Sequence, residues 1–473
     1  MSKLHDIVAK VWKLCDVLRD DGITYHQYVS ELTYLLFLKM AQETGTERLL
    51  LHHCRWGDLV ERHSDPDEQY RHYLHMLDDL GTRGRGRVKQ IFANPTTFLH
   101  HPESLNKLVA AIDAIDWHSI GREGLGDVYE GILQKNASEK KSGAGQYFTP
   151  RPLIDTTVEV LKPAPGETIV DPAAGTAGFF ISARAYAARK SRKADKLEAQ
   201  FFGVELVRET HRLALMNAML HEISGDIELG DSLAVDGVQL PPADLVLTNP
   251  PFGSKRGAGR PMRKDLLFAT SNKQLAFLQL IYESLKPGGR AGVVLPDNVL
   301  FEEGVASKIR SDLMEKCDLH TILRLPTGIF YAEGVKTNVL FFSKCKTKSP
   351  SGTKGVWFYD LRTDAPAFGK RTPLTRAHFE GFVRAFGDDP LGRSKRKDQG
   401  PEGRFRYFSR EFIREERQEN LDISWLKHEK PEESLELPEP EDIAAEIAAK
   451  LKIAMDEIDA LAALLDGSEV EVE

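Results

Sequence analysis

Hydrophobic positions in the first part of the chain recur at the three- and four-residue spacing of amphipathic helices. The pattern covers Ile7 to Leu18, about residues 26–43 and about residues 105–115, with charged residues between the apolar ones. Alternation of the kind that marks strands is scarce there, so residues 1–140 are expected to form an all-α N-terminal domain. Within it, the glycine- and arginine-rich residues 81–90 are expected to form a flexible basic loop.

From about residue 154 onward, helical and strand-like patterns alternate. Helical spacing covers residues 154–161, 179–190, 211–221 and 274–285. Short apolar runs typical of buried strands cover residues 168–171, 201–205, 227–231, 244–248, 289–296, 320–325 and 338–344. Because this alternation implies crossover connections, residues 141–425 are expected to form an α/β domain with a doubly wound, mostly parallel sheet. Residues 349–407 are mixed, and only 356–361 fit one more strand.

Residues 426–473 are expected to form an acidic tail, in which proline and glutamate dominate up to Glu441. Helical spacing follows over residues 442–465, with one apolar stripe made of Ile443, Ile447, Leu451, Ala454, Ile458, Leu461 and Leu465. A narrow stripe flanked by Glu and Asp favours a partner-binding helix, as in a coiled coil. Packing of this helix on its own domain is the alternative.

Composition narrows the class of protein. The chain has 473 residues and a mass of 53.0 kDa, and 41% of its residues are hydrophobic, which excludes global disorder. No apolar stretch approaches the roughly 20 residues of a membrane helix, and charges precede any apolar run at the start, so neither a membrane protein nor a secretory signal is expected. The four cysteines, Cys15, Cys54, Cys317 and Cys345, lie far apart, which fits reduced thiols and a cytoplasmic location.

The net charge of −8 is unevenly distributed. Residues 429–473 carry fifteen acidic and three basic side chains, a net charge of −12, whereas the other 428 residues carry 60 basic and 56 acidic ones, a net charge of +4. The acidity therefore belongs to the tail. The mildly basic remainder is compatible with DNA binding inside a complex and too weakly charged for tight binding by this chain alone.

The strongest local motif is Thr248-Asn-Pro-Pro-Phe252, at the end of the strand predicted at 244–248. In a doubly wound sheet such a strand end faces the ligand crevice. Pro250 and Pro251 lack backbone N–H groups, so the segment presents hydrogen-bond acceptors; Asn249 adds a side-chain oxygen and Phe252 a stacking face.

This combination suits a planar amino group such as adenine N6. Two acceptors, the Asn249 side-chain oxygen and the Pro250 backbone oxygen, can hold its two hydrogens and direct the nitrogen toward an electrophile. Phe252 can stack on the extruded base. The alternative is an ordinary turn at a strand end.

A second motif, Val170-Asp-Pro-Ala-Ala-Gly-Thr-Ala-Gly178, follows the first predicted strand and opens a helix. Small residues let a ligand approach the backbone closely, and the G-x-G-x-x-G fingerprint of dinucleotide binding is missing. Glu205 ends the second predicted strand, where an acid accepts hydrogen bonds from ribose hydroxyls, and Asp231 ends the third, near the place of an adenine ring. Each acid alone is more often a solvated strand end or a helix cap, but three strand-end signals in order favour a nucleotide-like cofactor.

A third motif, Gly145-Gln-Tyr-Phe-Thr-Pro-Arg-Pro152, precedes the first predicted strand. Thr149 is suited to cap a helix that begins near Pro150. The functional interpretation instead lays Tyr147, Phe148 and Thr149 over the cofactor.

Together the three motifs resemble those of adenine-N6 DNA methyltransferases of the γ motif order, most closely the modification (M) subunit of type I restriction–modification systems. Further similar segments are residues 295–301, 325–330, 335–342 and 420–427, so the resemblance covers nearly the whole chain, including the helical N-terminal domain. It implies the sheet of the S-adenosylmethionine-dependent methyltransferases. Phe252 stands where many relatives of the wider superfamily carry Tyr, a change that keeps stacking but removes a phenolic hydrogen bond.

The resemblance implies transfer of a methyl group from S-adenosylmethionine to N6 of adenine in duplex DNA. Cofactor contacts are expected from Gln146, Tyr147, Phe148, Thr149, Pro150, Arg151, Asp171, Thr176, Ala177, Gly178, Glu205 and Asp231, and catalytic contacts with the target base from Asn249, Pro250, Pro251 and Phe252. The partners implied are duplex DNA, a separate specificity subunit that chooses the site, a second copy of this chain, and a restriction subunit in the full complex.

Other features carry weaker signals. Basic residues 253–264 favour a clamp on the DNA backbone over a solvated loop, whereas residues 81–90 and 393–397 are evenly balanced between the two. The segments His52-His-Cys54 and His100-His101 contain metal-ligand types, but no second ligand pair at zinc spacing accompanies them, so no metal site is expected. No phosphate-binding loop occurs, so ATP-driven translocation is not expected of this chain.

Two other functions stay open at this point. A protein methyltransferase acting on a glutamine amide uses the same planar amino group, and a catalytically silent scaffold needs no chemistry at all. The long helical N-terminal domain and the basic segments favour DNA, and the intact motifs argue against a scaffold.

Overall fold

A computed structural model of the chain describes residues 3–14, 25–117, 149–190, 199–253, 263–330, 336–346, 352–366, 368 and 372–426. The chain divides into two compact units, Met1–Leu426 and Lys427–Glu473, and every described residue belongs to the first. The helix expected at 442–465 therefore lies outside the described residues, as do Gln146, Tyr147 and Phe148. Among the helices that the structure describes, none is both long and apolar enough to cross a membrane.

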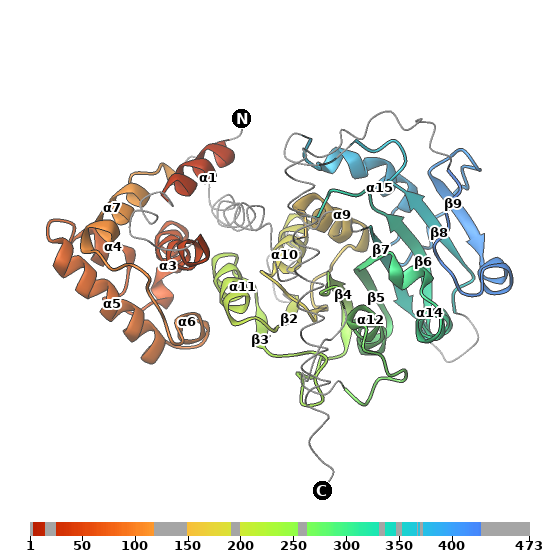
Figure 1. The fold of residues 1–473 in the computed structure, drawn as a ribbon, viewed down its shortest axis with the longest axis horizontal. Helices are drawn as coiled ribbons and strands as arrows, with labels where there is room; N and C mark the ends of the chain where they lie inside the picture. The colour runs from red at the N-terminus through yellow and green to blue at the C-terminus, as the bar shows by residue number, and fades with distance from the viewer. Residues whose placement is uncertain are drawn as a thin grey trace, which may run out of the picture. The chain divides into compact units, whose positions relative to one another are not determined.

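The described residues before 118 form helices and turns, as the apolar spacing predicts (Figure 1). The elements are α1 (Lys3–Lys13), α3 (Tyr25–Thr44), η1 (Thr46–Leu49), α4 (Trp56–Val60), α5 (Pro66–Thr82), α6 (Arg87–Ile91) and α7 (Pro102–Asp113). Helix α3 is buried along most of its described side chains because it carries a nearly continuous apolar run. Its buried Glu31 accepts hydrogen bonds from the Tyr73 hydroxyl (2.7 Å) and the Phe98 N–H (2.9 Å), which ties α3 to α5 and to the segment before α7.

The basic loop predicted at 81–90 is shorter than expected and covers only residues 83–86. Helix α5 continues to Thr82, and α6 begins at Arg87 because Val88 and Ile91 bury their side chains. The Arg87 guanidinium is partly buried and donates hydrogen bonds to the carbonyl oxygens of Ile223 (2.7 Å) and Gly225, and burial lowers its pKa. Of these basic residues, Arg87 therefore makes a packing contact, whereas Arg83 and Arg85 are exposed.

The described part of the chain contains one nine-stranded sheet with the strand order β3-β2-β1-β4-β5-β7-β6-β8-β9. Strands β1 to β5 are parallel, β7 is antiparallel to β5 and β6, β8 is parallel to β6, and β9 is antiparallel to β8. The bounds are β1 (Thr168–Asp171), β2 (Gln200–Glu205), β3 (Gly225–Leu229), β4 (Ala243–Thr248), β5 (Leu285–Pro296), β6 (Cys317–Arg324), β7 (Thr337–Lys344), β8 (Gly355–Asp360) and β9 (Phe405–Ser409). The predicted doubly wound, mostly parallel sheet is confirmed.

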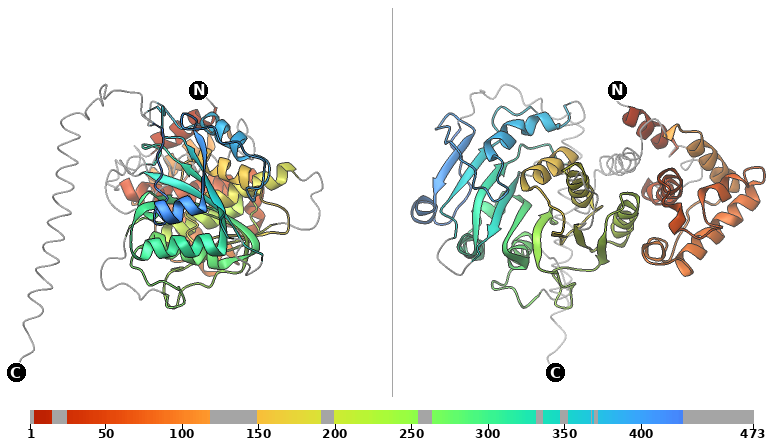
Figure 2. Two further views of the ribbon diagram at one scale, coloured as in Figure 1. Left: turned by 90° about the vertical axis from the view of Figure 1, so that its right-hand side faces the viewer. Right: turned by 180° about the vertical axis from the view of Figure 1, so that it is seen from behind.

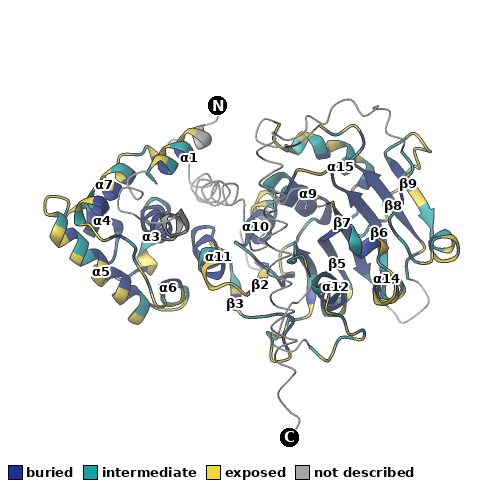
Figure 3. Ribbon diagram, viewed as in Figure 1, coloured by how far each residue is buried: buried dark blue, intermediate teal, exposed yellow. Residues whose placement is uncertain are grey.

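Helices cover both faces of this sheet (Figure 2). One core gathers side chains of α9 (Arg151–Leu161), α10 (Gly178–Lys190), α11 (Arg208–Leu220) and α15 (Glu380–Phe386), and the other those of α12 (Lys273–Ser284), α13 (Asn298–Phe301) and α14 (Val305–Lys316). The central strands are buried on both faces, which explains their continuous apolar runs, whereas the edge strands β3 and β9 are partly exposed (Figure 3). Short helices η3 (Arg376–Phe379) and η4 (Phe412–Glu416) complete the described elements.

The strand order reverses at β1, and this reversal positions the site. Strand β1 pairs with β2 on one side, Val170 facing Phe202, and with β4 on the other, Val170 facing Val246. The connections that leave the carboxyl ends of β1 and β4 run in opposite directions, which opens a crevice at that edge of the sheet. Asp171, Glu205 and Asn249 therefore come from adjacent strand ends.

An ion pair stabilises the sheet at the opposite end of β1, where this strand begins. The Arg290 guanidinium on β5 contacts both carboxylate oxygens of Glu167 (2.7 and 3.1 Å) and also donates to the carbonyl oxygens of Leu161 (2.7 Å) and Lys162 (2.9 Å). Because Leu161 ends α9 and Glu167 precedes β1, this single side chain joins α9, β1 and β5.

Replacement of Arg290 by Met is predicted to lower the free energy of unfolding by about 3 kcal/mol, since it leaves the Glu167 carboxylate without its buried partner. Urea denaturation measures the change. The matched control is Arg384→Met, which removes an exposed pair with Glu380 (3.7 Å) and should cost less than about 0.5 kcal/mol. Equal effects of the two substitutions would contradict the structural role of Arg290.

Candidate active site

The glycine-rich turn follows β1 and leads into α10. Asp171 is 2% exposed, and its Oδ1 accepts a hydrogen bond from the Ala173 N–H (3.0 Å). Gly175 and Ala177 both have left-handed backbone conformations, with φ of 55° and 66°, and Ala177 donates its N–H to the Ala174 carbonyl (2.8 Å). A left-handed alanine is strained, and such strain is concentrated at ligand sites. The turn is therefore held in one tight conformation.

Two buried polar side chains that the motif search missed hold this turn. Asn217 on α11 donates its amide N–H to the Thr176 carbonyl (2.8 Å), and the Ser232 hydroxyl donates to the Pro172 carbonyl (2.7 Å). Both side chains are buried, so the hydrogen bonds are shielded from water. A polar residue at an apolar position of the helix at 211–221 was the available sequence signal for Asn217.

Glu205 links the ends of β1 and β2. Its Oε2 accepts the Gly175 N–H (3.0 Å), and its Oε1 accepts the Val207 N–H (2.8 Å). Burial raises the pKa of Glu205, and the two backbone donors lower it. A carboxylate offers about four lone-pair directions, so the same oxygens can also accept hydrogen bonds from ligand hydroxyls.

Asp231 lies beyond the strand that it was expected to end. Strand β3 stops at Leu229 because the chain turns at Gly230 and Asp231, and the Asp231 Oδ1 accepts the Leu233 N–H (2.9 Å) inside that turn. The carboxylate remains partly exposed on the same edge of the sheet. The predicted position is therefore corrected by two residues, and the edge is the expected one.

The segment Asn249–Phe252 continues from β4 at the reversal of strand order. The Asn249 Nδ2 donates a hydrogen bond to the Thr149 Oγ1 (2.9 Å), and Phe252 packs its half-buried ring against the core. The structure thus brings the first and last of the three sequence motifs together across a separation of 100 residues. Pro250 is buried, whereas Pro251 is half-buried.

The alternative role of Thr149 as a helix cap is wrong. Helix α9 begins at Arg151, its N-cap residue is Pro150, and no side chain caps it. Thr149 instead accepts the Asn249 hydrogen bond, and Arg151 pairs with Asp155 in the first turn of the helix (3.3 Å). Thr149 therefore lies beside Asn249, where the Asn249 segment starts.

The electrostatics of the crevice are set by two neighbouring buried acids. Burial, and to a smaller extent the charge of Glu205, raises the pKa of Asp171, while hydrogen bonds from the Thr248 side chain and the Ala173 N–H lower it. The resulting pKa is about 7. A carboxyl in this state ionises readily when a cation arrives, because the cation offsets the cost of burying the charge. Perturbed acids of this kind concentrate at functional sites.

Apolar side chains at the same edge complete the crevice, and the sequence motifs did not include them. Leu206 is 63% exposed directly after Glu205, and Val207 and Leu229 at the ends of β2 and β3 are also exposed. Exposed large apolar side chains beside buried acids are typical of a ligand surface. An apolar pair directly after a strand-end acid was the signal available in the sequence.

The described basic side chains of residues 253–264 and 393–397 include ones that contact other protein groups. Arg396 is not a free cation for DNA: it lies over the Phe386 ring (4.8 Å), donates to the Thr321 hydroxyl oxygen (2.8 Å), and burial lowers its pKa to about 10. Residues 254–262 of the expected clamp lie outside the described residues, and Arg263 pairs with Asp265 (2.6 Å).

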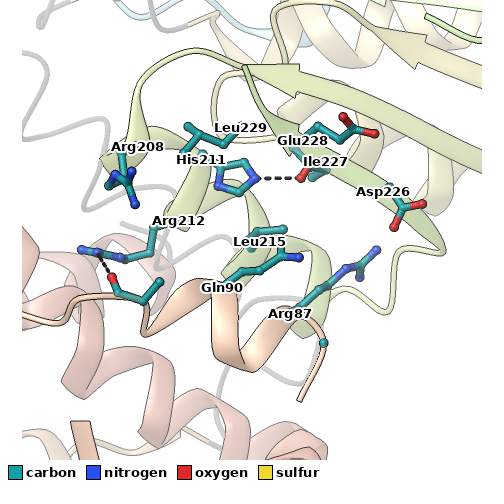
Figure 4. A pocket seen from close by; sticks show the side chains of 12 residues that line it. Arg87, Gln90, Arg208, His211, Arg212, Leu215, Asp226, Ile227, Glu228 and Leu229 are labelled. Carbon is teal, nitrogen blue, oxygen red and sulfur yellow. Dashed lines mark hydrogen bonds between the residues drawn. The ribbon is translucent and has the colours of Figure 1, made fainter. Parts of the chain in front are cut away.

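A cavity of about 590 Å³ lies between α6 and the outer surface of α11 and β3 (Figure 4). Its charged lining is mixed, with Arg87, Arg208 and Arg212 opposite Asp226 and Glu228, and the His211 ring contacts the Ile227 carbonyl oxygen (2.7 Å). None of the predicted site residues lines it. The cavity is therefore separate from the strand ends where the acids and the Asn249 segment converge.

The chain is similar to known proteins in sequence and fold. A model of the N-6 DNA methylase family matches residues 121–433, and a model of the HsdM N-terminal domain matches residues 7–51. The chain is 48% identical to the type I restriction enzyme StySPI methylase subunit of Salmonella potsdam, over 97% of this chain and 94% of that one. It is also 48% identical to the EcoKI methylase subunit of Escherichia coli K12, over 98% and 96%. The crystal structure of the EcoKI M protein superimposes with a TM-score of 0.57 and 44% identity, covering 98% of both chains.

The chain therefore belongs to the N-6 DNA methylase family, among the type I restriction enzyme methylase subunits. It is an enzyme, an adenine-specific DNA methyltransferase that acts as a modification subunit. The family resemblance of the three motifs is confirmed. These similarities give no support to a glutamine-amide methyltransferase or to a silent scaffold.

Asp171→Asn is predicted to change how stability depends on pH. The ordinary pKa of Asp171 is 3.8 and the folded chain raises it to about 7, so its contribution to stability is complete below about pH 4 and is lost as the pH rises through about 7. Since Asn cannot ionise, the variant's advantage in melting temperature should grow from about pH 4 to about pH 7 and then level off, corresponding to about 4 kcal/mol at most. Melting curves of both chains across this range test it; an advantage that does not change with pH would contradict a buried Asp171 carboxyl.

Proposed function

We propose that S-adenosylmethionine binds along the carboxyl ends of β1, β2 and β3, and that the target adenine enters beside it at the end of β4. The observation that carries this proposal is the hydrogen bond between Asn249 and Thr149 at the point where the strand order reverses. It supports a base pocket at the edge of the sheet where Asp171 and Glu205 end their strands.

The described residues fit this cofactor chemically. Glu205 can accept hydrogen bonds from ribose hydroxyls, and Leu206 beside it offers an apolar face for an adenine ring. Asp171 can ionise to hold an ammonium group, and the Thr176–Gly178 turn lets a ligand approach the backbone. Asp231, Pro150 and Arg151 are proposed as further contacts, together with Gln146, Tyr147 and Phe148 outside the described residues. When bound, S-adenosylmethionine supplies an electrophilic methyl group on its sulfonium.

The Asn249 segment performs the chemistry by positioning. With its nitrogen on Thr149, the Asn249 amide turns its oxygen away from Thr149, so that it can accept one hydrogen of the adenine amino group. The Pro250 carbonyl accepts the second, Pro251 keeps the segment rigid, and Phe252 stacks on the base. Two acceptors favour the positive charge that develops on nitrogen during an in-line displacement, so no covalent enzyme intermediate is needed.

Membership among type I restriction enzyme methylase subunits supports an assembly of several subunits. We propose that a separate specificity subunit selects the DNA site, that a second copy of this chain joins the complex, and that a restriction subunit completes it. The division into a helical domain (1–140), a methyltransferase domain (141–425) and an acidic tail with a partner-binding helix at 442–465 belongs to the same proposal. Arg396, a candidate for DNA contact, packs on a Phe ring instead. Fewer cations are then available for phosphate groups, which supports a chain that depends on partners for DNA affinity.

Asn249→Ala and Phe252→Ala are each predicted to lower the rate of methyl transfer to duplex DNA by at least about 100-fold, because each removes an interaction made to the reacting base. Cofactor affinity, measured by calorimetry, should change little. Tyr407→Ala serves as the matched control, since it removes an aromatic side chain on β9 at the far end of the sheet. Full activity in both pocket variants would overturn the assignment of the base pocket.

Tritium-methyl transfer with and without a co-expressed specificity subunit tests the assembly. The expected result is incorporation into duplex DNA that increases strongly when the specificity subunit is present, with little incorporation into protein. Equal transfer by this chain alone would contradict the proposed dependence on a partner.

A further inference from the structure

Three metal-ligand side chains from two distant segments meet in the helical part of the chain. His53 and Cys54 lie in the turn before α4, and Asp79 lies near the end of α5. The His53 Nε2 is 2.7 Å from the Asp79 Oδ2, and a ligand atom of each of the three residues lies within 4.8 Å of the other two. Among the described residues this is the one group of its kind.

The Cys54 thiol lies next to a carboxylate. Its side chain is fully buried, and its sulfur lies within 4.8 Å of a ligand atom of His53 and of one of Asp79. The sulfur and the Asp79 carboxylate therefore border the same small volume, where a divalent ion can offset the negative charge of both.

The turn that carries two of these ligands is held rigidly. Its Cys54 N–H donates to the Leu51 carbonyl (3.0 Å), the Asp58 Oδ2 accepts the Arg55 N–H (2.8 Å), and Trp56 is buried with its Nε1 on Asp113 (2.8 Å). Ligands on such a turn lose little freedom when an ion binds. Two changes accompany binding: the His53–Asp79 hydrogen bond (2.7 Å) opens so that both side chains face the ion, and the long Arg83 side chain, which pairs with Asp79 at 3.3 Å and is 71% exposed, turns toward solvent.

We propose that His53, Cys54 and Asp79 form a binding site for a divalent ion of the zinc class, with a fourth position open to water. One nitrogen, one sulfur and one oxygen ligand suit a borderline ion such as Zn²⁺ or Co²⁺, and not Mg²⁺ or Ca²⁺, which require oxygen ligands. On binding, the Cys54 S–H bond breaks, the proton leaves to solvent, and the sulfur forms a bond to the ion. The bound ion cross-links the turn before α4 to the end of α5.

The location gives this cross-link a structural consequence. Helix α5 ends at Thr82, and Arg87 at the start of α6 docks on the carbonyls of Ile223 and Gly225 in the methyltransferase sheet. An ion that fixes the end of α5 also fixes the segment that leads to this contact. The site lies outside the catalytic residues, so its occupancy is separable from the chemistry of methyl transfer.

Titration of the full chain with Co²⁺ tests the site directly. A cobalt–thiolate bond gives a charge-transfer absorption in the near ultraviolet, which histidine and carboxylate ligands do not give. The expected result is this absorption in the wild type, its loss in Cys54→Ser, and a cobalt affinity at least about tenfold weaker in His53→Ala and Asp79→Asn. Zn²⁺ should displace the cobalt and raise the melting temperature of the wild type but not of Asp79→Asn.

Matched controls separate this site from surface binding. The variants His100→Ala with His101→Ala, and Cys345→Ser, remove the same residue types elsewhere and should leave the absorption and affinity unchanged. Absence of the absorption in the wild type, or its loss in Cys345→Ser and not in Cys54→Ser, would overturn the proposal. Circular dichroism shows whether Cys54→Ser folds. If it does not fold, the cobalt affinities of His53→Ala and Asp79→Asn test the site, and unchanged affinity in both variants would contradict it.

Discussion

The reversal of strand order between β1 and β4 is the constraint on which the site depends. Strand β1 sends its chain toward β2 and β3, whereas β4 begins the other half of the sheet, so the carboxyl ends of these strands open a crevice. Without this reversal of strand order, Asp171, Glu205 and the Asn249 segment would follow strands whose ends form no common crevice. Here they become neighbours. The Glu205–Gly175 hydrogen bond joins the end of β2 to the turn after β1, and the Asn249–Thr149 hydrogen bond joins the segment after β4 to the segment before α9.

This arrangement has an energetic cost. Asp171 and Glu205 are both buried, burial raises the pKa of each, and Ala177 holds a left-handed backbone between them. Features of this kind lower stability and are retained where function needs them. The compensation is structural: Asn217 and Ser232 hold the turn from beneath, and the Arg290–Glu167 pair fastens the strands on either side.

Local sequence patterns predicted the helices and strands, which depend on neighbouring residues. They did not predict side-chain contacts between residues far apart in the sequence. Apolar runs located the central strands, because strands buried on both faces need such runs, whereas the exposed edge strand β3 was predicted two residues too late. Local patterns also missed that Arg87 and Arg396 are partly buried and hydrogen-bonded to distant groups, the Ile223 carbonyl and the Thr321 hydroxyl. For the same reason, the sequence patterns did not predict the contacts of Asp79 with His53 and of Thr149 with Asn249.

The most direct test of the account is a structure of this chain in complex with its specificity subunit, duplex DNA and an unreactive analogue of S-adenosylmethionine. The account predicts an extruded adenine between β1 and β4, with its amino group about 3 Å from the Asn249 Oδ1 and the Pro250 carbonyl oxygen and its ring on Phe252. An adenine bound elsewhere, or an analogue bound away from Glu205 and the Gly175 turn, would contradict it.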